Sequence, residues 1–201
     1  MNSVRALRWG AFLPATLLLA CTIDVRQVPA PRNSEAPASL SKHALYLGNI
    51  DVYSAEREHL AEAWKATLAS VIRSHRVFRT VQFLPKTKEE LKEPYSILDM
   101  EVRPKLEDGY NWWVTWPGIY PMSGYWPLQI RTAKYNLELH YRVVDENGQE
   151  VLKETVTQEA EHRIFFYGFF RTSAFEGMIE TANLEAMESC AKKLEAQFSS
   201  P

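Results

Sequence analysis

The spacing of apolar side chains predicts a strand, a helix and a second strand where the folded part of the chain begins. Residues 44–52 and residues 77–83 each have the apolar content and length of a strand. Between them, apolar residues recur every three or four positions from Leu60 to Ile72, as on one face of an amphipathic helix. Ser54 can cap this helix, which is expected to begin at Ala55 and to end near His75. Because the connections are short, the two strands are expected to pair in parallel.

The second half of the chain predicts antiparallel strands and a last helix. A strand over residues 97–103 is expected to end at Pro104. Apolar and polar residues alternate over 135–143, and residues 151–161 are expected to return as the partner strand after Asn147-Gly148, which suits a tight turn. From about Thr172, apolar residues follow helical spacing again. The predicted fold class is α+β, an α/β sandwich of order βαββββα, in which a mixed, largely antiparallel sheet of about five strands is covered by two amphipathic helices.

Residues 1–20 have the pattern of a signal peptide. Arg5 and Arg8 precede a short apolar run, whereas a membrane-spanning helix needs roughly 20 apolar residues. The run ends in Leu18-Leu19-Ala20-Cys21, which resembles the lipobox of bacterial lipoproteins. The resemblance implies cleavage before Cys21, attachment of a diacylglycerol to its thiol, and acylation of its new amino group by a fatty acid such as palmitate. The alternative is an ordinary signal peptide that leaves a free thiol.

Residues 21–42 are predicted to join the lipidated Cys21, as a tether, to a single domain over residues 43–201. The tether holds Pro29, Pro31 and Pro37 among small and polar residues. A linker of this composition spans about 25 Å as a flexible coil and about 65 Å when Pro-stiffened. Enterobacterial lipoproteins retained in the inner membrane carry an aspartate where this chain has Thr22. The resemblance therefore implies anchoring in the outer membrane on its periplasmic face, with the inner membrane and the cell surface as alternatives.

The segment from Tyr110 to Ile130 is the most informative feature for function. It has no charged residue and seven Trp or Tyr rings, and its Pro and Gly residues exclude a continuous helix. Such rings offer roughly 1,000 Å² of surface, and burying it yields on the order of 25 kcal/mol. The segment is therefore a loop folded over the sheet, or a contact surface for a protein, lipid headgroups or a sugar. The predicted contact residues, which include a second aromatic patch before the last helix, are Trp112, Trp113, Trp116, Tyr120, Tyr125, Trp126, Phe165 and Phe166.

Composition and charge exclude several functional classes. The chain has 201 residues, 46% of them apolar, and a formal net charge of −2, which excludes a disordered protein and argues against nucleic-acid binding. The five His residues form no H-x-x-x-H pair and Cys190 has no cysteine at metal-ligand spacing, so we expect neither a metal nor a cofactor. Asp99 and Glu101 share one face of a strand, but alternating acids more often form the wet face of a sheet. The sequence predicts no catalytic residue.

The order of elements, together with the lipobox and the strand–helix–strand from Leu45 to Phe83, resembles an α/β domain of envelope proteins. Examples are the amino-terminal domain of TolB and the body of the curli-secretion lipoprotein. The strands predicted here are not of the length that the membrane-spanning hairpins of the curli-secretion family require. We expect a non-enzymatic, lipid-anchored envelope protein that docks with other envelope components as an accessory to transport or assembly. The alternative is a module that binds lipid or glycan through the aromatic segment. The expected partners are the membrane and an envelope protein, and the oligomeric state is open.

Overall fold

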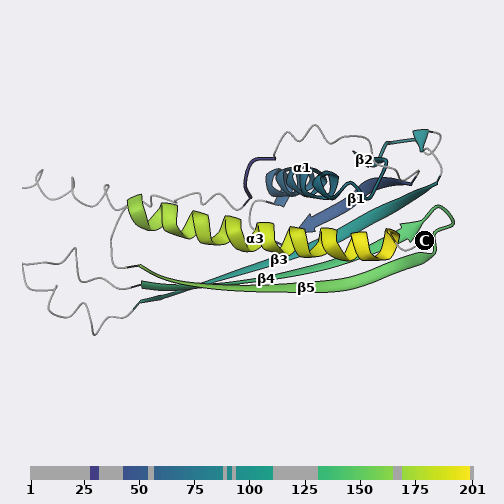
Figure 1. The fold of residues 1–201 in the computed structure, drawn as a ribbon. Helices are drawn as coiled ribbons and strands as arrows, with labels where there is room; N and C mark the ends of the chain where they lie inside the picture. The colour runs from purple at the N-terminus through teal and green to yellow at the C-terminus, as the bar shows by residue number, and fades with distance from the viewer. Residues whose placement is uncertain are drawn as a thin grey trace, which may run out of the picture.

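The computed structural model describes residues 28–31, 43–53, 57–87, 90–91, 94–110, 131–164 and 169–199. Over these residues the chain forms a five-stranded sheet with two helices on one of its faces (Figure 1). The elements are β1 (Ala44–Val52), α1 (Arg57–His75), β2 (Thr80–Phe83), β3 (Tyr95–Tyr110), β4 (Arg131–Asp145), β5 (Glu150–Ile164) and α3 (Phe169–Phe198). The predicted α+β class and the order βαββββα are confirmed.

The sheet is mixed, with the strand order β2-β1-β3-β4-β5. β1 runs parallel to both of its neighbours, so the parallel pairing predicted for the first two strands is confirmed. β3, β4 and β5 are antiparallel to one another, and β5 is an edge strand of 15 residues. In the turn before β5, Gly148 has a φ of 78°, a conformation in which glycine is favoured. The side chain of Asp145 accepts hydrogen bonds from the backbone N–H groups of Asn147 and Gln149 and holds this turn.

The prediction that the third strand ends at Pro104 is wrong, because β3 continues through Pro104 to Tyr110. The carbonyl of Val102 faces β1, where it accepts a hydrogen bond from the N–H of Tyr53. Residues two apart on a strand point their backbone groups to the same side, so Pro104 turns its nitrogen to that side as well. β1 has ended by then, and the missing N–H of Pro104 costs no hydrogen bond between strands. β4 and β5 are likewise longer than predicted.

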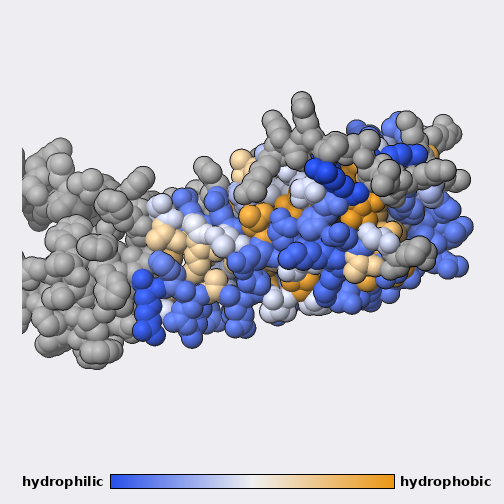
Figure 2. Space-filling model, viewed as in Figure 1, coloured by the Kyte–Doolittle hydropathy of each residue, from blue (hydrophilic) through white to orange (hydrophobic). Residues whose placement is uncertain are grey.

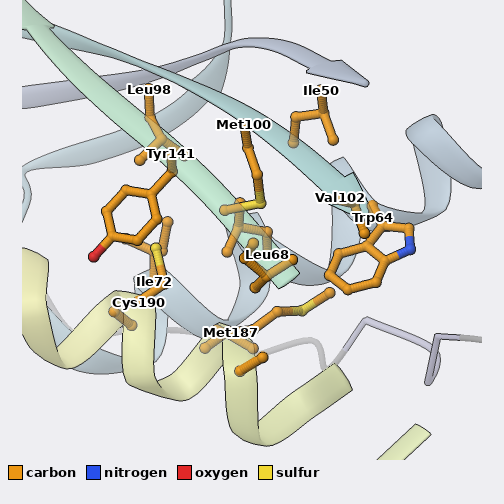
Figure 3. Close-up of a cluster of buried hydrophobic side chains, with 14 of the residues drawn as sticks. Ile50, Trp64, Leu68, Ile72, Leu98, Met100, Val102, Tyr141, Met187 and Cys190 are labelled. Atoms are coloured by element: carbon orange, nitrogen blue, oxygen red, sulfur yellow. The ribbon is translucent and has the colours of Figure 1, made fainter. Parts of the chain in front are cut away.

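The core lies between the sheet and the two helices (Figure 3). Trp64 and Leu68 of α1 and Met187 of α3 are fully buried against the apolar face of β3 and β4. The predicted start of the first helix at Ala55 lies outside the described residues. None of the described helices is both long and apolar enough to span a membrane. Cys190 is also fully buried, and this burial raises the pKa of its thiol to about 12, as expected for an inert core cysteine.

Candidate docking site at the end of the sheet

The sheet brings the strand ends that flank the two aromatic segments to one end of the molecule. Tyr110 pairs with Arg131 across β3 and β4, and Arg131 pairs with Ile164 across β4 and β5. Residues 111–130 therefore connect the ends of a β-hairpin, and residues 165–168 leave the sheet from the neighbouring strand. Figure 1 shows these three strand ends together at the left, at the opposite end from the C-terminus. The structure thus places the points from which both aromatic segments start.

The predicted contact and lipidation residues themselves lie outside the described residues. These are Cys21, Trp112, Trp113, Trp116, Tyr120, Tyr125, Trp126, Phe165 and Phe166.

The strand ends lie on an arm that extends beyond β1. β1 ends at Val52, which is in register with Val102 of β3. From there on, three strands continue without β1, and we call Arg103–Tyr110, Arg131–Glu138 and Thr157–Ile164 the arm. At about 3.3 Å per residue, these eight-residue stretches carry the aromatic segments about 25 Å past the end of β1.

The outer face of the arm, away from the helices, carries opposite charges in register. Lys134 stands opposite Glu107 on one side and Glu161 on the other. Its amino nitrogen lies 3.7 Å from a carboxylate oxygen of Glu161, and the amino group of Lys105 lies 2.7 Å from Glu107. The hydrogen bond from Lys105 lowers the pKa of the Glu107 carboxyl. The described residues of this face therefore offer solvated charges to a loop that would fold over it.

The inner face of the arm is held by the first half of α3. Phe175 of α3 is buried against Ala133 of β4. The hydroxyl of Tyr135 donates a buried hydrogen bond of 2.7 Å to Oδ1 of Asn183, and burial raises the pKa of Tyr135. A buried hydrogen bond between a strand and a helix fixes their relative position, because leaving either polar group unpaired is costly. The arm is therefore positioned by the first half of α3.

A groove with a volume of about 620 Å³ runs between α3 and the edge strand β5. The Cβ of a residue placed at Gly177 would meet no heavy atom within 4 Å, so the groove is open at this position. No sequence pattern indicates this groove, because small residues on a helix do not reveal which strand they face. In Figure 2, residues of intermediate hydropathy, coloured from pale blue to pale orange, lie over the first half of α3 beside hydrophilic ones. The lining residues are Gln158, Glu159, Ala160, His162, Ser173, Ala174, Gly177, Met178, Thr181, Ala182 and Glu185.

A second hollow, of about 380 Å³, lies on the outer face of the sheet near the end of β1. Its carboxylates are paired: Asp99 accepts hydrogen bonds from Arg142 and from the backbone N–H of Asn49, and Glu101 accepts one from Arg103. This pairing fits the wet-face interpretation of Asp99 and Glu101. Within the described ranges, no three His, Cys, Asp or Glu residues are grouped so that they could hold a metal ion.

One contact has the residue types of a nucleophile and its base. Nε2 of His43 lies 2.9 Å from the hydroxyl oxygen of Ser96. Ser96 is fully buried, so its hydroxyl is closed to a substrate. Burial lowers the pKa of His43, and the ring packs against Phe78 and Phe198. This contact is therefore a structural hydrogen bond within the core.

The chain is similar to a known protein family over most of its length. A protein-family model matches residues 13–195. The chain belongs to this family. The family match covers the predicted tether, both aromatic segments and every strand. The search of curated proteins finds no match.

Solved structures of three bacterial proteins resemble the chain at low sequence identity. A Helicobacter pylori protein assigned as a homologue of a neuraminyllactose-binding hemagglutinin is 12% identical, with a TM-score of 0.49 over 88% of this chain and 95% of that one. A PelC dodecamer from Paraburkholderia phytofirmans is 13% identical, with a TM-score of 0.42 over 78% and 95%. A minor lipoprotein from Acinetobacter baumannii is 13% identical, with a TM-score of 0.38 over 81% and 93%. The function is therefore inferred below from this chain's own residues.

Proposed function

We propose that this protein is a non-enzymatic, lipid-anchored envelope protein that docks with other envelope components through its two aromatic segments. The observation that carries the proposal is the pairing of Tyr110, Arg131 and Ile164, which makes both segments start from one end of the arm. The anchor is Cys21, and the proposed location is the periplasmic face of the outer membrane. The proposed partner is an envelope protein involved in transport or assembly.

The chemistry of the aromatic segments favours contact with a protein. Trp and Tyr are the residue types that most often dominate protein interfaces, because they combine a large apolar area with a polar group. Residues 110–130 contain seven such rings and no charge, whereas the outer face of the arm is charged. Burying these rings against a partner would therefore remove apolar surface that the charged face of the arm is poorly suited to cover.

The docking proposal is tested by replacing Trp112, Trp113, Trp116 and Trp126 with Ser together. We expect crosslinking to envelope proteins in intact cells to be lost while the thermal midpoint stays nearly unchanged. Trp64→Ser is the matched control, since Trp64 is fully buried and its truncation should cost about 3–5 kcal/mol. If the fourfold variant is destabilised as strongly as Trp64→Ser, the aromatic segment belongs to the core and the docking proposal is wrong.

The anchor is tested separately by Cys21→Ser. We expect the wild-type protein to float with membranes and to carry the added mass of acyl chains at its amino terminus. The variant should lose both properties, because the thiol is the proposed site of lipid attachment. Flotation that is equal in the two proteins would contradict lipid anchoring through Cys21.

The groove between α3 and β5 supports a second candidate function, the binding of lipid or glycan. Its volume of about 620 Å³ lies within the range of small-molecule sites. Gly177→Leu places a larger side chain at a residue that lines the groove, where the position of its Cβ is free of neighbours within 4 Å. If the groove binds lipid or glycan, we expect this variant to lose the co-purifying ligand but to keep its protein crosslinks. An unchanged ligand content would rule out the groove as the binding site.

A further inference from the structure

A short piece of the predicted tether is part of the folded domain. Val28 is only 7% exposed and belongs to the main hydrophobic core. The backbone carbonyl of Pro29 accepts a hydrogen bond of 2.9 Å from the hydroxyl of Thr67 on α1. Figure 1 shows this segment, Val28–Pro31, in purple beside α1. The sequence predicts a flexible linker at these positions, so this docking is a finding of the structure.

The docked segment is held by residues that are distant in sequence. Thr67 is itself 97% buried, with 3% of its surface exposed. A helical Thr can bond to a carbonyl of its own preceding turn, but the Thr67 hydroxyl donates to a carbonyl 38 positions away in the chain. Ala30 and Pro31 are exposed, so the buried contact is confined to the beginning of the segment. Val28 and Pro29 thus form a defined attachment point on the surface of α1.

We propose that this attachment point divides the tether, so that the domain is held close to the bilayer by a leash of only six residues, Thr22 to Gln27. The inference rests on the proposed lipidation of Cys21. Fully extended, the chain from Cys21 to Val28 spans about 25 Å, whereas a free tether up to His43 would span about 75 Å. Residues 32–42 lie beyond the attachment point and add nothing to the reach of the leash. The attachment point beside α1 is therefore held within about 25 Å of the lipid surface.

The test compares two insertions of the same length on either side of the attachment point. Twenty Gly-Ser residues are inserted between Asp24 and Val25 in one protein and between Ser34 and Glu35 in the other. The first insertion raises the root-mean-square reach of the leash from about 15 Å to about 30 Å. The second leaves this reach unchanged if Val28 is docked. In a free tether, the two insertions would have equal effects.

The distance to the bilayer is measured by energy transfer in vesicles whose headgroups carry an acceptor dye. The donor is attached at Gln149→Cys, an exposed position, and the buried thiol of Cys190 stays unlabelled. We expect the insertion after Asp24 to lower the transfer efficiency and the insertion after Ser34 to leave it unchanged. Equal losses in an acylated protein would overturn the leash but leave the lipid anchor intact. An unacylated Cys21 would overturn both.

The attachment point is tested on its own with Val28→Asp, which places a charge in the core. Ala30→Asp is the matched control, because it adds the same charge two residues further on at an exposed position. With Val28→Asp, the insertion after Ser34 should lower the transfer efficiency as much as the insertion after Asp24. With Ala30→Asp, the difference between the insertions should persist. If Val28→Asp also preserves that difference, Val28 does not hold the leash.

Discussion

His75 joins the two helices through a pair of carboxylates and makes stability depend on pH. It is the last residue of α1, and its side chain is 14% exposed. Nε2 lies 2.8 Å from Glu188 and Nδ1 lies 3.0 Å from Glu195, both on α3. Burial by itself would lower the pKa of His75, but the hydrogen bonds and charges of Glu188 and Glu195 outweigh it and raise the pKa. The protonated imidazole is therefore the form that the folded state favours.

The contribution of protonated His75 to the free energy of unfolding depends on how far its two carboxylate partners are exposed to solvent. A hydrogen bond to a charged group contributes about 1.5–3 kcal/mol when it is well buried. Glu188 and Glu195 are 40% and 47% exposed, so solvent screening reduces the combined contribution to about 1 kcal/mol. Because the folded-state pKa lies above 6.5, this stability is fully present below pH 6.5 and is lost as the pH rises through the folded value. For a domain of this size, it corresponds to about 3 °C in the thermal midpoint.

The assay is thermal unfolding, followed by circular dichroism, of the Cys21→Ser protein with and without His75→Gln. We expect the midpoints to differ by about 3 °C at acidic pH and to converge at alkaline pH. The lowered pKa of His43, which burial causes, has the opposite effect on stability, but it is common to both proteins and cancels in the difference. A midpoint difference that does not change with pH would refute the role of the imidazolium.

One further substitution and one labelling reaction test the buried core. Tyr135→Phe removes the hydroxyl that donates a buried hydrogen bond to Asn183. The free energy of unfolding, measured in urea, should fall by about 1–2 kcal/mol. A variant as stable as the wild type would contradict this role of the hydrogen bond. Cys190 should resist alkylation in the folded protein at pH 8 and react fully in the unfolded protein, because burial raises the pKa of its thiol to about 12. Rapid labelling of the native protein would instead show an accessible thiol.

The periodicity of the sequence was sufficient to predict the elements and their order, but not how far the strands extend. Alternation from Tyr135 to Val143 marks β4, yet its continuation to Arg131 depends on partners in β3 and β5. Both aromatic segments start from the same end of the sheet because β3, β4 and β5 extend equally far. Since the strand lengths could not be predicted, this shared starting point could not be predicted either. Val28 is a single apolar residue among Pro and Ala, and no local pattern distinguishes a docked residue of this kind from a linker. Its burial depends on a surface that α1 provides.

Pro104 has a consequence for how neighbouring molecules meet. Among the described residues, no strand pairs with the β1 side of β3 beyond Val52, and unpaired edges can recruit strands from other copies of a protein. A recruited strand would need a donor at each alternate residue of β3, and the ring nitrogen of Pro104 supplies none. The residue that was expected to stop the strand thus interrupts the row of donors on this edge of β3, which makes the edge a poorer template for intermolecular strand addition.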